Sequence, residues 1–252
     1  MARTAYVDYN VLLSLMDGRK TIEDIYTFTN QRDITFFYSA SHVQEADNIP
    51  ASHPNRNSFI KQRLNYINKL TCGNYLYSDT SNPNVVVRLN ANAFDLLETI
   101  TEVPFGKDMM RRLTNLIGEP QRQAVRDSLG ISTKELNNYT IPQILQHLEK
   151  LAGMTNMTFA QFMEHTKSFH KDRDSFGFHN DVAGVFEILD IIGYWKDSYT
   201  ENSNFARLWD ASHTAFAASC DYFLTNDQKT YNKVQVVYHI YDIKTKTFLF
   251  RS

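Results

Sequence analysis

Residues 208–227 read LWDASHTAFAASCDYFLTND, and three aspartates stand here among apolar, small and aromatic side chains. The alanines Ala211, Ala215 and Ala218 recur at i, i+4 and i+7. This spacing predicts a helix with a smooth face that packs close against a sheet. Residues 222–224 (YFL) predict a short strand. The stretch therefore favours an α/β fold, with Asp210 opening the helix, Asp221 in the turn before the strand and Asp227 following it.

The first 50 residues show the same alternation of short strands and helices. Residues 4–8 form a β-prone run, and Asn10 is the expected N-cap of the helix after it. Residues 34–38 predict a second apolar strand. Ser41 and Gln44 have the spacing of a capping box at the start of the next helix. Short apolar runs that alternate with helices predict parallel strands covered on both faces.

The character of the chain changes between residues 51 and 205. Amphipathic helical patterns dominate there, such as SFIKQRLNYINKL and IPQILQHLEKLAGM, and residues 84–89 (NVVVRL) predict an isolated strand. We therefore expect residues 1–50 and 206–252 to form one core and residues 51–205 to form a mainly helical insertion. A chain of 252 residues, 42% of them hydrophobic, is long enough to bury a sizeable core.

Charge and cysteine content limit the possible functions. The formal charge of −2 argues against a generally basic nucleic-acid coat but allows a local basic patch. Cys72 and Cys220 are far apart and lack metal-ligand spacing, which is typical of free thiols in a reducing compartment. Since no apolar run approaches the roughly 20 residues of a membrane span, we expect a soluble cytoplasmic protein without membrane association.

Four acids fall at equivalent places in the expected sheet: Asp8, Glu45, Asp210 and Asp227. In open α/β sheets, the carboxyl ends of strands and the helix N-termini above them form the crevice where ligands bind. Carboxylates that share a crevice repel one another, and hard divalent cations with oxygen ligands hold such clusters together. Two such ions can activate water and stabilise a phosphoryl leaving group. Each acid also has a structural explanation, such as a helix cap for Asp210 or a turn for Asp8.

Three segments resemble the motifs of the PIN-domain ribonucleases: VDYNVLL, FFYSASHVQEA and DASHTAFAASCDYFLTND. The last block is the most specific in its spacing and its small residues. The resemblance covers roughly the first and last fifths of the chain. It implies an α/β fold with a three-layer, Rossmann-like parallel sheet of the PIN type and a large helical insertion.

The resemblance also implies roles for single residues. Asp8, Glu45, Asp210 and Asp227 would be the catalytic acids that ligate Mg²⁺ or Mn²⁺, and Asn10 and Thr225 would orient them. In the family, the metals activate a water that attacks an RNA phosphodiester. His213, one turn after Asp210, is a further supporting candidate, with structural packing as the alternative. Asp221 lies at the opposite end of the YFL strand from Asp227 and is expected to be structural.

Substrate contacts require cations, because most protein contacts to nucleic acids go to phosphates. The expected contacts are Arg56, Lys61, Arg63 and Lys229, and a second basic group contains Arg111, Arg112, Arg122 and Arg126. Solvated helix faces are the alternative explanation for each of them.

We therefore expect a metal-dependent endoribonuclease that acts on RNA, of the toxin or defence-effector kind. An inhibitory protein partner and a homo-oligomer stay open. Two other functions also stay open: a catalytically silent PIN-like module that binds RNA or protein, and a structure-specific DNA nuclease. A haloacid-dehalogenase-type phosphatase is disfavoured, because Asn10 stands where that chemistry needs a second aspartate.

Overall fold

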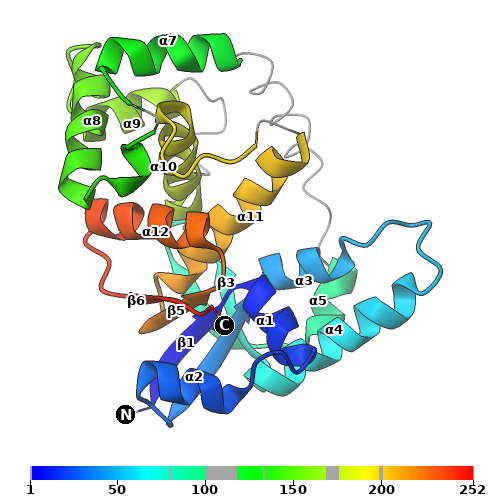
Figure 1. Cartoon of the computed structure of the whole chain (residues 1–252). Coiled ribbons are helices and arrows are strands. Elements are labelled where there is room, and N and C mark those ends of the chain that lie inside the picture. The colour runs from blue at the N-terminus through cyan, green and yellow to red at the C-terminus, as the bar shows by residue number, and fades with distance from the viewer. Residues whose placement is uncertain are drawn as a thin grey trace.

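A six-stranded sheet forms the centre of the molecule (Figure 1). The computed structural model describes residues 2–79, 81–99, 118–132, 134–168, 176–198 and 201–251, and only the backbone of 201–205. The described strands are β1 (Arg3–Val7), β2 (Ile34–Ser39), β3 (Asn74–Ser78), β4 (Val86–Asn90), β5 (Tyr222–Thr225) and β6 (Lys246–Leu249). The strand order is β4-β3-β2-β1-β5-β6, and every pair except β3 with β4 is parallel. The prediction of an α/β fold with a parallel sheet is confirmed.

The order of the strands reverses beside β1. The chain builds β2 and β3 outward on one side of β1, and later adds β5 and β6 on the other side. The adjoining ends are in register, since Val7 of β1 pairs with Leu224 of β5. Such a switch point leaves a crevice at the carboxyl ends of the two central strands, where open α/β sheets bind their ligands.

Both faces of the sheet are buried in hydrophobic cores. Successive side chains of a strand point to opposite faces, so alternate residues belong to different cores. Ala5 and Val7 of β1 belong to one hydrophobic core, and Tyr6 between them belongs to the other. The first core packs under α1 (Tyr9–Met16), α2 (Ile22–Thr29), α3 (Ala40–Asp47), α4 (Arg56–Thr71) and α5 (Ala93–Thr99). This two-sided burial explains why the strands read as continuous apolar runs.

The second core joins the sheet to the helices of the later part of the chain. These are α7 (Glu119–Leu129), α8 (Ile141–Gly153), α9 (Phe159–Ser168), α10 (Phe178–Ile192), α11 (Glu201–Ala217) and α12 (Gln228–Ile240), with a 3₁₀ turn at Leu136–Asn138. Figure 1 shows α7 to α10 gathered at one end of the molecule, with α11 and α12 between them and the sheet. Ala211 and Ala215 are buried in this core, as the alanine spacing predicts.

Three helix starts differ from the sequence-based expectation. Asp8, and not Asn10, is the N-cap of α1. The chain passes directly from β2 into α3, so that Ser39 with His42 forms the cap, and the Ser41–Gln44 prediction is wrong. Asp210 does not open its helix, because α11 begins at Glu201 and nothing between the two residues breaks a helix.

The segment between residues 51 and 205 contributes to the sheet as well as supplying helices. Residues 84–89 were expected to be an isolated strand, but β4 pairs antiparallel with β3 as the edge of the sheet. The sequence reading missed β3, whose NYLYS run is too short to show a clear alternation. The remaining described elements of this segment are helical. None of the described helices combines the length and the apolar character that a membrane span requires.

Truncation of a β3 core residue tests the place of this strand. Leu76 is fully buried, so Leu76→Ala is expected to lower the free energy of unfolding by about 2–5 kcal/mol. The matched variant Leu89→Ala removes an exposed leucine of β4 and should change it by no more than about 0.5 kcal/mol. Urea unfolding measures both values. Equal losses in the two variants would contradict the interior position of β3.

Candidate active site

Asp8 stands at the carboxyl end of β1, beside the switch point of the sheet. The residue is only 3% exposed. One carboxylate oxygen accepts a hydrogen bond from the backbone N–H of Asn10 at 2.8 Å, and the other accepts one from the Thr225 hydroxyl at 2.5 Å. Thr225 ends the neighbouring strand β5, so it has the orienting contact that was predicted for it. Asn10 contributes its backbone to the site, and its side chain is exposed.

Asp227 occupies the equivalent position after β5. Its Oδ1 accepts hydrogen bonds from the backbone N–H groups of Lys229 and Thr230, at 2.6 and 2.9 Å, and it is thereby the N-cap of α12. Its own N–H donates to the hydroxyl of Thr225 at 3.1 Å. Asp8 and Asp227 therefore both lie at helix N-termini, where free N–H groups and the helix dipole favour a negative charge.

The other two predicted acids come from helices that pack against each other, α3 and α11. Asp210 and His213 are three residues apart on α11 and therefore share one face of that helix. Glu45 lies in α3, and its Oε2 is 3.0 Å from Nε2 of His213. The contact between the two helices thus brings Glu45 to the face of α11 that carries Asp210.

The structure brings Asp8, Glu45, Asp210 and Asp227, which we call the acid cluster, close enough to act on one another. Burial raises the pKa of Asp210 well above its ordinary value, and the charges of the other three acids raise it further. Burial also raises the pKa of Asp8 and of Glu45, although the charge of His213 opposes this shift in both.

Asp210 is the least compensated member of the acid cluster. Asp8 and Asp227 cap helices, and Glu45 pairs with His213. Among the described residues, no hydrogen-bond donor reaches the carboxylate of Asp210, and the charge of Lys233 lowers its pKa by less than burial and the other three acids raise it. A carboxylate in this position destabilises the fold unless a cation joins it.

His213 is buried between the acid cluster and the sheet. The residue is 2% exposed, its Nε2 faces Glu45, and its Nδ1 lies 2.7 Å from the hydroxyl of Tyr6. Burial alone would lower the pKa of His213, but the hydrogen bond to Glu45 and the charges of Glu45, Asp8 and Asp210 outweigh it and raise the pKa. His213 therefore acts as a fixed partner of the acids and not merely as packing beside the alanine face.

A second histidine, His42, completes a buried hydrogen-bond network that the sequence did not reveal. Its Nε2 donates to the carbonyl of Val7 at 2.8 Å, since a carbonyl can only accept. Burial lowers the pKa of His42 well below its ordinary value, so the ring is neutral and its Nδ1 accepts from the N–H of Ser39 at 3.2 Å. Tyr6 joins the network through a 2.6 Å hydrogen bond to the hydroxyl of Ser39.

Tyr6 and Ser39 have a role in positioning that the sequence reading missed. Both are fully buried. Each belongs to an apolar strand, where a tyrosine reads as core and a serine as the beginning of a turn. The available signal was the position of polar atoms at the carboxyl ends of β1 and β2, because buried polar groups need partners.

Behind the acid cluster, a buried ion network joins three helices. Lys233 of α12 is 1% exposed, and its Nζ lies 2.6 Å from Oδ1 of Asp190 in α10 and 2.8 Å from Oδ2 of Asp197. Arg207 of α11 binds the other oxygen of Asp190 at 2.5 Å and Glu187 at 2.6 Å. The network fixes α11 and α12, the helices that carry Asp210 and begin after Asp227, against α10.

The predicted substrate contacts lie in different surroundings. Arg56 is bound to Asp47 and to the carbonyl of Ile49, so it secures the loop after α3. Lys61 is exposed on α4. Lys229 lies in the first turn of α12, two residues after Asp227, with its Nζ 3.0 Å from Asp197.

Arg63 is the predicted cation whose charge reaches the acid cluster, since it lowers the pKa of Glu45. In the second basic group, Arg122 and Arg126 are buried and paired with glutamates, so they have a structural role. Arg111 and Arg112 lie outside the described residues.

Carboxylate oxygens are the donors that Mg²⁺ and Mn²⁺ prefer, and the acid cluster supplies four such side chains. Its donor chemistry therefore fits a hard divalent cation. Within the part of the chain that the structure describes, no three or more His, Cys, Asp and Glu side chains are already arranged to hold a metal ion.

Comparisons with protein-family models, with curated proteins and with solved structures give no match to this chain.

Removal of the Asp210 charge should stabilise the protein while no divalent cation is present. The folded-state pKa is raised above its ordinary value of 3.8, so the carboxylate costs stability increasingly as the pH rises from 3.8 through the folded-state pKa. Asp210→Asn should therefore match the wild type near pH 3.8 and exceed it by about 1 kcal/mol at pH 7, as measured by urea unfolding in EDTA.

Asp221→Asn is the matched control for that measurement. Hydrogen bonds from Thr4, first from its backbone N–H, and the contact with Arg3 lower the pKa of Asp221. This carboxylate therefore stabilises the fold above pH 3.8, and its replacement should lower the free energy of unfolding at pH 7. A loss of stability in Asp210→Asn under the same conditions would contradict the proposed repulsion.

The buried ion network predicts a contrast between two lysines. Lys233→Met removes the fully buried cation that Asp190 and Asp197 share and should lower the free energy of unfolding by about 3–5 kcal/mol. Lys229→Met removes a half-exposed contact to one of them and should cost no more than about 1 kcal/mol. Urea unfolding at pH 7 compares the two variants. Similar losses in the free energy of unfolding would show that the network does not join α12 to α10.

Proposed function

We propose that this chain is a metal-dependent endoribonuclease with a PIN-type core, which hydrolyses RNA phosphodiester bonds. The observation that carries the proposal is the acid cluster: Asp8, Glu45 and Asp227, from separate stretches of chain, lie close enough to Asp210 for their charges to raise its pKa. Open α/β sheets bind their ligands at switch points such as the one beside β1, which supports the proposal. The lack of hydrogen-bond donors to the Asp210 carboxylate among the described residues supports it as well.

The acid cluster would hold Mg²⁺ or Mn²⁺, which when bound supplies an activated water and stabilises the leaving oxygen. Asp8 is held in place by Thr225 and by the first turn of α1, and Asp227 by the first turn of α12. These contacts fix the carboxylates before any ligand arrives, which is the preorganisation that a catalytic site needs.

His213 and Tyr6 orient Glu45 through two hydrogen bonds in series. The hydrogen bond from His213 leaves Oε1 of Glu45 for a ligand, while the Tyr6 hydroxyl holds the imidazole ring from its other nitrogen. Partners of this kind fix the direction of a ligating group and raise its effectiveness. The arrangement favours an active nuclease over a silent binding module, because a module without catalysis has no need to keep four repelling acids together.

Cleavage of single-stranded RNA in Mn²⁺ tests the proposal. Replacement of a partner behind the ligands commonly costs about 10–100-fold, so removal of a carboxylate itself should cost at least about 100-fold. Asp210→Asn is therefore expected to reduce kcat by at least about 100-fold, and Thr225→Val, which frees Asp8, by about 10–100-fold. A gel assay with a labelled oligonucleotide measures both.

The control is Asp221→Asn, at the far end of β5 from the acid cluster, which should keep the activity of the wild type. Calorimetry in Mn²⁺ provides a second readout, since the metal should bind the wild type and not Asp210→Asn. Undiminished cleavage by Asp210→Asn would remove the acid cluster from the reaction. Parallel assays with single-stranded DNA of the same sequence decide between the ribonuclease and the DNA nuclease.

A further inference from the structure

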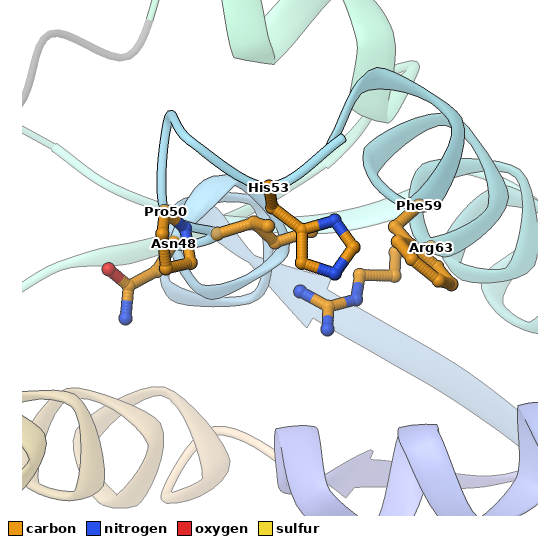
Figure 2. Close-up of a pocket in the computed structure, with 6 residues that line it drawn as sticks. Asn48, Pro50, His53, Phe59 and Arg63 are labelled. Atoms are coloured by element: carbon orange, nitrogen blue, oxygen red, sulfur yellow. The ribbon is translucent and has the colours of Figure 1, made fainter. Parts of the chain in front are cut away.

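A hollow of about 350 Å³ opens between the loop that follows α3 and the first half of α4. Its lining residues are Asn48, Ile49, Pro50, His53, Phe59 and Arg63 (Figure 2). The volume lies in the range of pockets that hold small organic ligands. The lining combines aromatic rings, a cation and an amide, which is a composition suited to an aromatic ligand that carries a negative charge.

The aromatic part of the hollow consists of His53 and Phe59. Their ring centroids are 5.2 Å apart in an edge-to-face arrangement. Phe59 is 38% exposed although it is a large apolar residue on a surface helix. Exposed aromatic rings beside a cation are the usual platform on which proteins stack the bases of single-stranded nucleic acids. Figure 2 shows the guanidinium of Arg63 below the His53 ring and to the left of Phe59 in that view.

Arg63 supplies the cation. Its Nη1 donates to the carbonyl of Ala46 at 3.3 Å, and its guanidinium lies 5.9 Å from the ring centre of Tyr9. Among the described residues no carboxylate forms an ion pair with Arg63, in contrast to Arg56, which is bound to Asp47. A guanidinium has five N–H donors, so Arg63 keeps donors that can reach a phosphate.

The hollow lies next to the acid cluster. Ala46 and Tyr9, which Arg63 contacts, directly follow Glu45 and Asp8 in the chain. A chain that places one phosphate at the acid cluster can therefore set its neighbouring nucleotide over α4.

We propose that this hollow is a nucleotide subsite for single-stranded nucleic acid, in which a base stacks on Phe59 beside the His53 ring and its phosphate binds Arg63. The position of the cleaved bond relative to the subsite rests on the proposed nuclease function, whereas the binding itself does not. Base-paired strands do not fit this mode, because their bases are stacked on one another and not free to stack on a side chain.

The test measures oligonucleotide binding by the full chain in the Asp210→Asn background, which removes cleavage from the experiment. Fluorescence anisotropy gives the Kd for single-stranded RNA, single-stranded DNA and the duplex of the same sequence. Phe59→Ala is expected to weaken single-strand binding by about tenfold or more, the usual effect of losing one stacking platform. The Kd for the duplex should be weaker than for either single strand and should not respond to the substitution.

Phe28→Ala is the matched control, because Phe28 is an exposed phenylalanine of α2 that packs on Phe248 and Phe250. It should leave every Kd unchanged. Unfolding curves of both variants establish that the fold is retained. Arg63→Lys keeps the charge but not the planar fork of donors, and is expected to weaken single-strand binding several-fold.

The outcomes separate the two proposals. Cleavage by the wild type with a KM that is the same in Phe59→Ala would retain the nuclease and overturn the subsite. Binding that depends on Phe59 without any cleavage by the wild type would retain the subsite and overturn the nuclease. A hollow that serves a protein partner would leave all oligonucleotide Kd values unchanged in Phe59→Ala, which also overturns the subsite. The RNA and DNA arms show which sugar the subsite accepts.

Discussion

Repulsion among the carboxylates of the acid cluster is the constraint around which the surrounding structure is arranged. Two of these side chains lie at the N-termini of α1 and α12, where backbone N–H groups donate hydrogen bonds to the carboxylates and the helix dipole favours their negative charge. A third is paired with His213, which is held in turn by Tyr6. Asp210 has no such hydrogen-bond partner among the described residues, and burial and the other three acids raise its pKa. The charged carboxylate of Asp210 lowers the free energy of unfolding, and a ligand that binds the acid cluster in the folded state would raise it again.

The helices of the middle of the chain have a physical connection to this site. α11 and α12 carry or adjoin two of the acids, and the ion network around Lys233 and Asp190 locks both helices to α10. Removal of one member of a buried network leaves an uncompensated charge, so the network resists separation of the helices. The later helices thus act as a support for the acid cluster, in addition to filling the second hydrophobic core.

Much of the fold could be predicted because its strands and helices carry strong local signals. The strands around Tyr6, Phe36 and Phe223 are apolar runs, and the alanine face of α11 shows a clear helical spacing. The helix starts were harder to predict, because the capping residue depends on where the preceding strand ends. Asp8 and Ser39 are therefore the N-caps, whereas the sequence had indicated other residues for these caps. β3 was missed because pairing with β2 and β4, and not its own pattern, makes it a strand.

The sequence by itself determined the alternation of strands and helices and the positions of Asp8 and Asp227 just after two of the strands. Only the tertiary structure decided that β5 lies beside β1, which creates the switch point and sets Thr225 against Asp8. It also decided that His213 faces Glu45 and that Arg63 lies beside an aromatic hollow. These contacts join residues far apart in the chain, and local periodicity carries no information about which distant segments will pack together.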